Sequence, residues 1–304
     1  MNEVEKNEVD CSIVIVNWNS TDYLVECIKS ILQMTKCSYE IIVIDNNSSP
    51  EERAKLLEMD NIRLLLNENN MGFAAANNQG IRQAKGKCVL LLNPDTKLVN
   101  NAIDRMLAFL NSHEAIYAIG PKLYRSCKFD YHPSVKSFDS PMYNLFFLIP
   151  GSLYLKNFYQ FFLSKAKRPK KVNCLIGAAI LLRRSVFDKV GLLDEQFFLY
   201  SEEVDLFFRM KQAGLKTVYY PEAKVIHYGG KSQQKSTGVK MNYLWTSKIR
   251  YFEKYHGKLN VTINLYLIYL LLKTKLILFK KNELAQLCGL IEMKLNKKLD
   301  KYGI

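Results

Sequence analysis

The sequence predicts an α/β protein in which a mostly parallel central sheet is flanked by helices and followed by a helical C-terminal extension. Two observations predict this class. Short apolar runs alternate with amphipathic segments over the first hundred residues, and a polar cluster follows each apolar run. The runs are apolar on both faces, as strands of buried parallel sheets are. The order β-α-β-α-β-α-β implies right-handed crossovers, so we expect helices on both sides of one sheet.

The individual elements follow from local composition. The Val-, Ile- and Leu-rich runs predict strands at 11–16, 40–44, 62–66 and 88–92. The amphipathic segments between them predict helices at 23–34, 50–59 and 74–84, and the second of these begins with a proline, which suits a helix start. Helices are also expected after the acidic cluster at 201–205, at 243–255, and as one or two segments over 261–279 and 284–299.

Length and composition exclude several classes of protein. A chain of 304 residues allows one large α/β domain with a tail, or two ordinary domains. With 48% hydrophobic and 24% charged residues, the chain is neither collagen-like nor of low complexity, and wholesale disorder is excluded. This composition is typical of a folded globular protein.

The net charge of +14 is unevenly distributed. Residues 156–171 and 256–304 carry most of the excess, and in both segments the lysines neighbour aromatic or aliphatic side chains. Cations beside apolar side chains suit an anionic membrane surface. Nucleic acid is the rival partner, but no nucleic-acid-binding motif accompanies the charge, so we expect none.

The predicted location is the cytoplasm, peripheral on the inner face of the cell membrane. Residues 1–10 are polar and acidic, without the basic and apolar regions of a signal peptide. The longest apolar stretch is interrupted at Asn264 and Lys273, which leaves it too short to cross a bilayer. The C-terminal helices are expected either to lie on the membrane or to form a homodimer contact.

Polar residues follow each of the four predicted strands, at 17–19, 45–48, 67–72 and 93–95. Each cluster alone could be a turn. Four in succession predict a ligand site, because the carboxyl ends of parallel strands meet at one edge of the sheet. No G-x-G-x-x-G and no Walker A motif follows the first strand, so another group must handle any phosphate. A divalent metal, Mg²⁺ or Mn²⁺, held by a strand-end carboxylate is the usual substitute.

The motifs in this order resemble the inverting glycosyltransferases of family 2, and most closely the rhamnosyltransferase-like subgroup of bacterial polysaccharide synthesis. The resemblance covers about residues 11–232, and the segments that carry it are 14–19, 42–48, 69–74, 77–80, 90–95, 177–178, 197–206 and 227–232. It implies the GT-A fold, the nucleotide-diphospho-sugar transferase fold of that family. By this resemblance, residues 1–10 are a tail, 11–232 are the catalytic domain and 233–304 are a basic helical extension. Within the catalytic domain, 11–120 would hold the nucleotide-sugar and 121–232 the acceptor.

The resemblance also implies roles on the donor side. Asp45 would contact the pyrimidine base, and Asn17 together with Asn77 or Asn78 would line the nucleotide pocket. The small residues Gly177 and Ala178 would let the backbone approach the donor sugar closely.

The metal would be bound through a second set of residues. Asp95 matches the last acid of the family's D-x-D motif, and Asn93 replaces the first. His227 follows a strand-like segment and would contact the metal or the diphosphate, although a lone histidine is more often structural.

The acids at 202–205 are the obvious source of a general base. An attacking hydroxyl needs a carboxylate within hydrogen-bond reach to take its proton. Glu203 stands where the family carries the catalytic Asp, which makes it the expected base, and Glu202 is the alternative. Acids that open a helix could also be caps that interact with its dipole. Asp205 is the best candidate for a cap or for pairing with Arg209.

Three functions from different classes follow from these residues. The first is an inverting, metal-dependent transferase that moves rhamnose from dTDP-rhamnose, with UDP-linked hexoses left open, to a lipid-linked oligosaccharide or polysaccharide acceptor. The second is a non-catalytic, membrane-associated module that binds sugar-nucleotides or polysaccharide. A basic nucleic-acid binder is the third and weakest.

Overall fold

The computed structural model describes residues 8–138, 160–229, 237–279, 288–289 and 291–295. Three predictions lie partly or wholly outside these residues: part of the acceptor half between 121 and 171, the motif at 230–232 and the expected helix at 284–299. Clustering of contacts divides the chain into two compact units, and each is described here by itself. The first contains Met1–Ser137, Gln160–Phe198 and Glu202–Gln234; the second contains Phe138–Tyr159, Leu199–Ser201 and Lys235–Ile304.

The first half of unit 1 confirms the predicted alternation of strands and helices. Its elements are β1 (Cys11–Asn17), α1 (Thr21–Met34), β2 (Tyr39–Asp45), α2 (Pro50–Leu57), β3 (Arg63–Leu66), α3 (Phe73–Gln83) and β4 (Cys88–Leu92). β1 pairs in parallel with β2 and β4, and β2 pairs in parallel with β3. Asn17 and Asp45 are opposite one another in the register, so the polar clusters that follow β1 and β2 begin side by side.

The second half of unit 1 extends this sheet with shorter and mixed strands. Its elements are β5 (Thr96–Leu98), α4 (Ala102–Asn111), β6 (Ile116–Tyr124), β7 (Val135–Lys136), β8 (Lys170–Val172), β9 (Cys174–Leu175), β10 (Ala179–Arg183), α7 (Ser185–Val190), α8 (Glu202–Gln212) and β11 (Lys216–His227). The strand order is β3-β2-β1-β4-β10-β6-β11-β5, with β8 beside β11 and a separate β7–β9 pair.

The direction of these later strands brings distant segments to the edge at which β1 and β4 end. β10 is antiparallel to β4, and Ala179 at its start lies opposite Leu92 at the end of β4. Gly177 and Ala178 therefore enter the sheet at that edge. β11 is parallel to β6, which is antiparallel to β10, so β11 ends at the same edge with His227 opposite Thr96.

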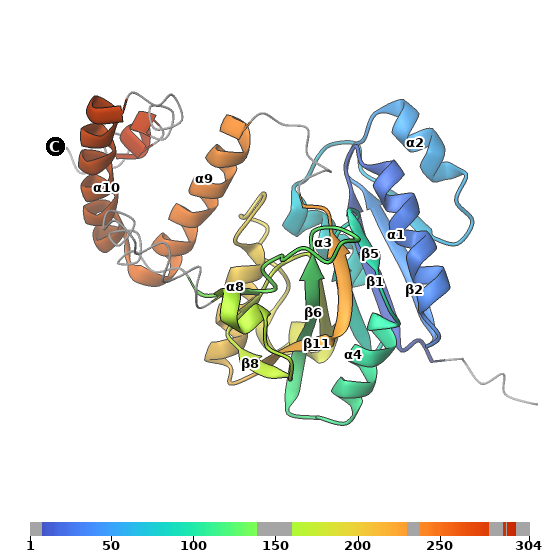
Figure 1. Ribbon diagram of the computed structural model, residues 1–304. Coiled ribbons are helices and arrows are strands. Elements are labelled where there is room, and N and C mark those ends of the chain that lie inside the picture. Colours follow the sequence, from blue (N-terminus) through green and yellow to red (C-terminus); the bar gives the residue numbers. More distant parts are fainter. Residues whose placement is uncertain (1–7, 139–159, 230–236, 280–287, 290, 296–304) are drawn as a thin grey trace, which may run out of the picture. The chain divides into compact units, whose positions relative to one another are not determined.

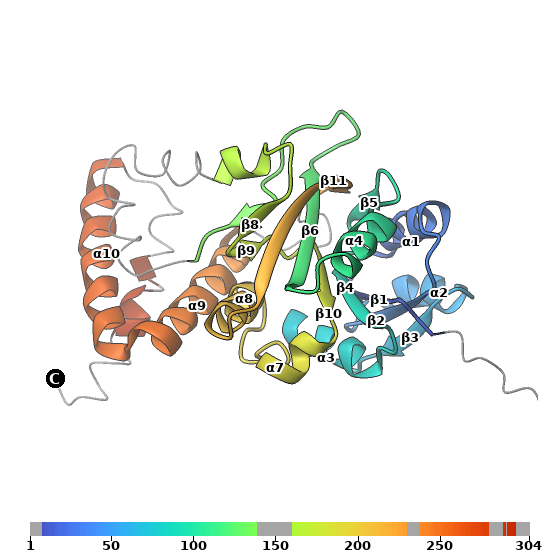
Figure 2. The same ribbon diagram turned by 90° about the horizontal axis from the view of Figure 1, so that it is seen from below.

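Helices cover both faces of the sheet. α1 and α4 pack on one face, while α3 and α7 lie on the other (Figure 2). α3 approaches the sheet closely at Gly80, where a β-carbon would clash with Val14 and lie 2.8 Å from Ile44 Cδ1. Figure 1 looks onto a face of the sheet, with the more distant α3 drawn fainter behind the strands.

One expectation about the strands is wrong. β3 is not buried on both faces, because Arg63 and Leu66 are exposed. Its place at the edge of the sheet explains this, since an edge strand has a neighbour on one side only.

Unit 2 contains two long helices in its described part, α9 (Thr237–His256) and α10 (Lys258–Phe279), which contact each other. α10 buries Val261, Leu265 and Ile268. Among the described residues no helix is long and apolar enough to span a bilayer.

Candidate active site

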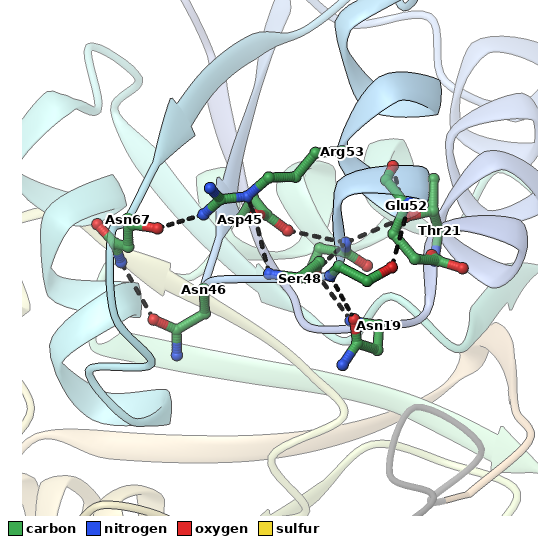
Figure 3. Close-up of polar contacts among 10 residues, drawn as sticks. Asn19, Thr21, Asp45, Asn46, Ser48, Glu52, Arg53 and Asn67 are labelled. Atoms are coloured by element: carbon green, nitrogen blue, oxygen red, sulfur yellow. Dashed lines mark hydrogen bonds and ion pairs between the residues drawn. The ribbon is translucent and has the colours of Figure 1, made fainter.

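Asp45 at the end of β2 lies in a closed network of hydrogen bonds and is fully buried (Figure 3). Its Oδ2 accepts from Arg53 Nε at 2.7 Å and from the Ser48 amide at 3.1 Å. Its Oδ1 accepts from Asn17 Nδ2 at 3.3 Å. Arg53 also donates to the carbonyl of Asn67 and so joins the ends of β2 and β3. The Asp45 carboxylate, which we expect to contact the pyrimidine base of the nucleotide, is thus held by Arg53 on α2.

The other amides expected in the nucleotide pocket are also engaged. Asn77 Nδ2 donates to the carbonyl of Phe73 at 2.8 Å, within its own helix. Asn78 bonds the backbone of Leu193 through both its oxygen and its nitrogen, and it donates to Glu195 Oε1 at 2.9 Å. Both amides are buried, and Asn78 holds the segment after α7 against α3.

The next polar cluster, after β4, brings Asn93 and Asp95 to His227 at the end of β11. His227 Nε2 lies 3.3 Å from Asp95 Oδ1 and 3.2 Å from Asn93 Nδ2. Asp95 is 1% exposed and His227 is buried, while Asn93 is half-buried. Three residues singled out from the sequence therefore meet in one buried cluster.

A second histidine controls the tautomer of the first. His132 Nδ1 lies 2.7 Å from the Pro133 carbonyl, which can only accept, so this nitrogen carries a proton. Burial lowers the pKa of His132 to about 4, which keeps the ring neutral and leaves Nε2 as an acceptor. His227 Nδ1, at 3.1 Å, then donates to it. A neutral His227 consequently presents an unprotonated Nε2 beside Asp95.

These residues fit a divalent cation. A carboxylate oxygen and an imidazole nitrogen face one another, and the Oδ1 of Asn93 is buried with no hydrogen-bond partner among the described residues. An imidazole that donates its other N–H to an acceptor is the usual metal-ligand arrangement. The described part of the chain contains no group of three His, Cys, Asp or Glu side chains able to hold a metal. Diphosphate oxygens would complete the coordination.

The acidic cluster opens α8, as expected, and its acids are buried. Glu202 is 5% exposed and Glu203 9%. Burial, and then the charge of Glu203, raise the pKa of Glu202 to about 8. Asp205 is fully buried and pairs with Arg209 at 2.8 Å, which confirms the pairing expected for it.

Glu203 has a cationic partner from a different part of the chain. Lys136 Nζ, on β7, lies 2.9 Å from Glu203 Oε1. The other carboxylate oxygen, Oε2, is buried and has no hydrogen-bond partner among the described residues. Gly177 lies beside the same carboxyl, since a β-carbon there would be 3.7 Å from Glu203 Cδ.

Backbone contacts connect these parts of the site. The Asn93 amide donates to the Ala178 carbonyl at 2.9 Å, which places the start of the Asn93–Asp95 cluster against the segment beside Glu203. On the donor side, the Phe73 amide donates to the Phe198 carbonyl at 2.7 Å, just before the acidic cluster. The strand-end polar residues and the acids of α8 therefore share one edge of the sheet.

Arg53, His132 and Lys136 were missed by reasoning from sequence. Arg53 looks like an ordinary surface residue of an amphipathic helix. His132 and Lys136 lie in the part, 121–232, that we expected only to hold the acceptor. No periodicity marks a strand as short as the one that carries Lys136.

The fold is the GT-A fold of glycosyltransferases, as predicted. Residues 12–191 match the model of glycosyl transferase family 2, so the chain belongs to this family. Its curated relatives include rhamnosyltransferases. It is 29% identical over 233 residues to the N-acetylglucosaminyl-diphospho-decaprenol L-rhamnosyltransferase of Mycobacterium tuberculosis, with 71% of this chain and 75% of the relative covered. It is 22% identical to the dTDP-rhamnosyl transferase RfbF of Shigella flexneri, with 66% and 63% covered.

Solved structures support the fold. GalNAc-T7 with UDP, GalNAc and Mn²⁺ superposes with a TM-score of 0.62 at 19% identity, over 82% of this chain and 48% of that one. The mannosyltransferase PcManGT from Pyrobaculum calidifontis, in complex with GDP-Man and Mn²⁺, gives 0.57 at 12% identity, over 93% and 84%.

Proposed function

We propose that this chain is an inverting glycosyltransferase that moves rhamnose from dTDP-rhamnose to a lipid-linked oligosaccharide at the inner face of the cell membrane. The meeting of the Asp95–His227 pair and the buried Glu203 at one sheet edge is the observation that carries this proposal. The names of the two rhamnosyltransferase relatives support the sugar, the nucleotide and the lipid-linked acceptor.

The metal, Mg²⁺ or Mn²⁺, would be held by Asp95 and His227, with Asn93 beside them, and it would neutralise charge on the departing diphosphate. On the donor side, Asn17 and Asp45, with Asn77 or Asn78, would support the nucleotide. Asp45 has no exposed surface, so Arg53 must move off its carboxylate before the pyrimidine base can contact Asp45. Gly177 and Ala178 would lie under the donor sugar.

Glu203 would take the proton of the acceptor hydroxyl on Oε2. As that O–H bond breaks, the acceptor oxygen forms a bond to the anomeric carbon. The bond from that carbon to the diphosphate oxygen breaks on the opposite side, and the electron pair leaves with the nucleoside diphosphate. Attack opposite the leaving group inverts the anomeric configuration.

The donor is tested by thermal shift with nucleotide-sugars, because a ligand that binds only the folded state raises the melting temperature. We expect dTDP-rhamnose with Mn²⁺ to raise it most, and Asp95→Asn to remove the part of the shift that depends on Mn²⁺. NMR of the product should show the inverted anomer. Binding without turnover would instead support a non-catalytic module. A larger rise in melting temperature with a UDP-sugar would identify that sugar, and not dTDP-rhamnose, as the donor.

Membrane association is supported by α10. Its exposed apolar side chains recur at helical spacing along one face, at Leu259, Ile263, Tyr266, Leu267 and Leu270. Lysines flank this face at Lys258 and Lys273. Apolar side chains with neighbouring cations suit the interface of an anionic bilayer, and a homodimer is the alternative use of the same face.

Sedimentation with vesicles tests this surface. We expect binding to phosphatidylglycerol vesicles, weaker binding to phosphatidylcholine, and loss of binding in Ile263→Ser with Leu267→Ser. Leu57→Ser, at an exposed leucine of α2, is the matched control and should bind as the unmodified chain does. A switch from dimer to monomer in the double variant, with vesicle binding unchanged, would assign α10 to a second chain. Retention on DNA at equal salt would favour the nucleic-acid binder.

A further inference from the structure

The two glutamates that open α8 are adjacent in sequence, yet their surroundings differ. Both have a buried Oε2 without a hydrogen-bond partner among the described residues. Only Glu203 has an ion pair with a lysine in the described part of the chain, through its Oε1 at 2.9 Å from Lys136 Nζ. Two carboxylates this close disfavour each other's ionisation, so a nearby cation decides which of them carries the charge.

We propose that Lys136 is a positioning residue that selects Glu203 over Glu202 as the proton acceptor, by holding Glu203 Oε1 and leaving Oε2 for the acceptor hydroxyl. This inference rests on the proposed function. It answers a question that sequence reasoning left open, since either glutamate could have been the base.

The geometry supports both parts of the selection. An ammonium group at 2.9 Å stabilises the ionised form of Glu203 and occupies its Oε1. Gly177 leaves space beside the same carboxyl, and the Asn93–Ala178 contact places this space next to the Asp95 cluster. Burial, and then the charge of Glu203, raise the pKa of Glu202, and the charge of Lys136 lowers it by less, so the protonated form of Glu202 is favoured at neutral pH.

The position of Lys136 in the fold explains why it can act on this pair. β7 pairs antiparallel with β9, with Lys136 opposite Cys174. β9 packs against α8 and leads directly into Gly177. The same short ribbon thus brings both the lysine and the glycine to one carboxyl.

The other charged groups on α8 and on the helix that packs against it are Asp205, Arg209 and Lys211 on α8 and Asp188 and Lys189 on α7. On α8 itself, Asp205 pairs with Arg209. On α7, which packs against α8, Lys189 lies over the Tyr117 ring, and Asp188 is the remaining acid. β9 contributes no charged side chain. Lys136 and the two glutamates are therefore the groups whose titration we expect to be linked.

The experiment uses Lys136→Met, which removes the charge at similar length, and Lys136→Arg, which keeps it. Lys55→Met, which removes a surface ion pair with Asp22 on unrelated helices, is the matched control. The first readout is carboxyl ¹³C NMR of glutamate-labelled protein as a function of pH, with Glu202→Gln and Glu203→Gln used for assignment. This readout needs no donor or acceptor.

We expect the Glu203 carboxyl to titrate at higher pH in Lys136→Met, to return toward its original value in Lys136→Arg, and to be unaffected in Lys55→Met. An unchanged Glu203 titration in Lys136→Met, or ionisation of Glu202 before Glu203 in the unmodified chain, would overturn the proposal.

The second readout is the pH profile of rhamnosyl transfer. The acidic limb should move up in Lys136→Met, and a movement of one unit means a roughly tenfold loss of rate at pH values below the limb. KM for the donor should stay unchanged. A uniform loss at every pH, without a shift of the limb, would indicate a structural role only and would contradict the proposal. If the NMR shift is present but Glu203→Gln retains full transfer, the assignment of the base fails while the Lys136–Glu203 coupling stands.

Discussion

Each of the three carboxylates at one edge of the sheet has a different partner, and that partner determines what the carboxylate can bind. Asp45 is held by Arg53, Asp95 faces His227, and Glu203 is paired with Lys136. The sequence predicted all three acids, because each follows a strand or opens a helix after an aromatic run. His227 was expected beside Asp95 from the family resemblance, but Arg53 and Lys136 were not predicted. Lys136 is far from Glu203 in the chain, and only the fold brings the two together.

His132 provides a test of the proposed metal site at the residue scale. His132→Ala removes the acceptor for His227 Nδ1–H, so the imidazole loses its fixed orientation and tautomer. We expect the affinity for Mn²⁺, measured by electron paramagnetic resonance in the presence of dTDP, to fall roughly 10- to 100-fold. His132→Gln, which keeps an acceptor oxygen, should recover much of the affinity. Equal affinity in His132→Ala and the unmodified chain would show that the second histidine does not support the site.

The buried Glu202 predicts how the free energy of unfolding changes with pH. Because its pKa is raised to about 8 in the folded protein, the folded state keeps a proton that the unfolded chain releases near pH 4.5. Stability contributed by this residue is therefore present at low pH and is lost as the pH rises between those values, by up to about 1.4 kcal/mol per pH unit. Above the folded-state pKa the loss is complete.

Urea unfolding of the unmodified chain and Glu202→Gln measures this effect. Glutamine mimics the protonated carboxyl, so the difference in unfolding free energy should grow in favour of Glu202→Gln from about pH 5 to about pH 8. A difference that stays constant with pH would mean that Glu202 is ionised in the folded protein like an ordinary glutamate.

At the scale of elements, the first half of the chain was predictable and the second half was not. β1, β2 and β4 are continuous apolar runs with helices of clear periodicity between them, so composition alone identified them. β7, β8 and β9 have two or three residues each, and pairing with distant strands determines them. Short strands of this kind carry no periodic signal. Lys136 lies on one of them.

The packing of α3 on the sheet gives a test at this scale. Gly80→Ala places a methyl group against Val14 and Ile44, where there is no space for it. We expect a loss of about 1–3 kcal/mol in the free energy of unfolding, which urea titration would measure. Gly289→Ala, where a β-carbon meets nothing within 4 Å, is the control and should not be destabilised. If Gly80→Ala left the free energy of unfolding unchanged, α3 could move away from the sheet.

For the whole molecule, the order of motifs along the chain predicted the family and the GT-A fold, because each motif sits at a strand end and the strands share one edge. The uneven charge predicted a partner for the basic segments. Whether that partner is a membrane or a second chain is not tested, so membrane binding stays a prediction. The division at residues 232–233 also stays a proposal. Parts of both basic segments lie outside the described residues, and charge alone does not distinguish the two partners.

The central claim is that the acid at 203 collects the acceptor's proton while a separate group of residues binds the donor. The most direct measurement is the rate of rhamnosyl transfer by Glu203→Gln, made on protein whose affinity for dTDP-rhamnose with Mn²⁺ has been determined by calorimetry. The account predicts donor affinity close to that of the unmodified chain and a rate reduced by roughly 10²–10⁴. Transfer at the unmodified rate would contradict it.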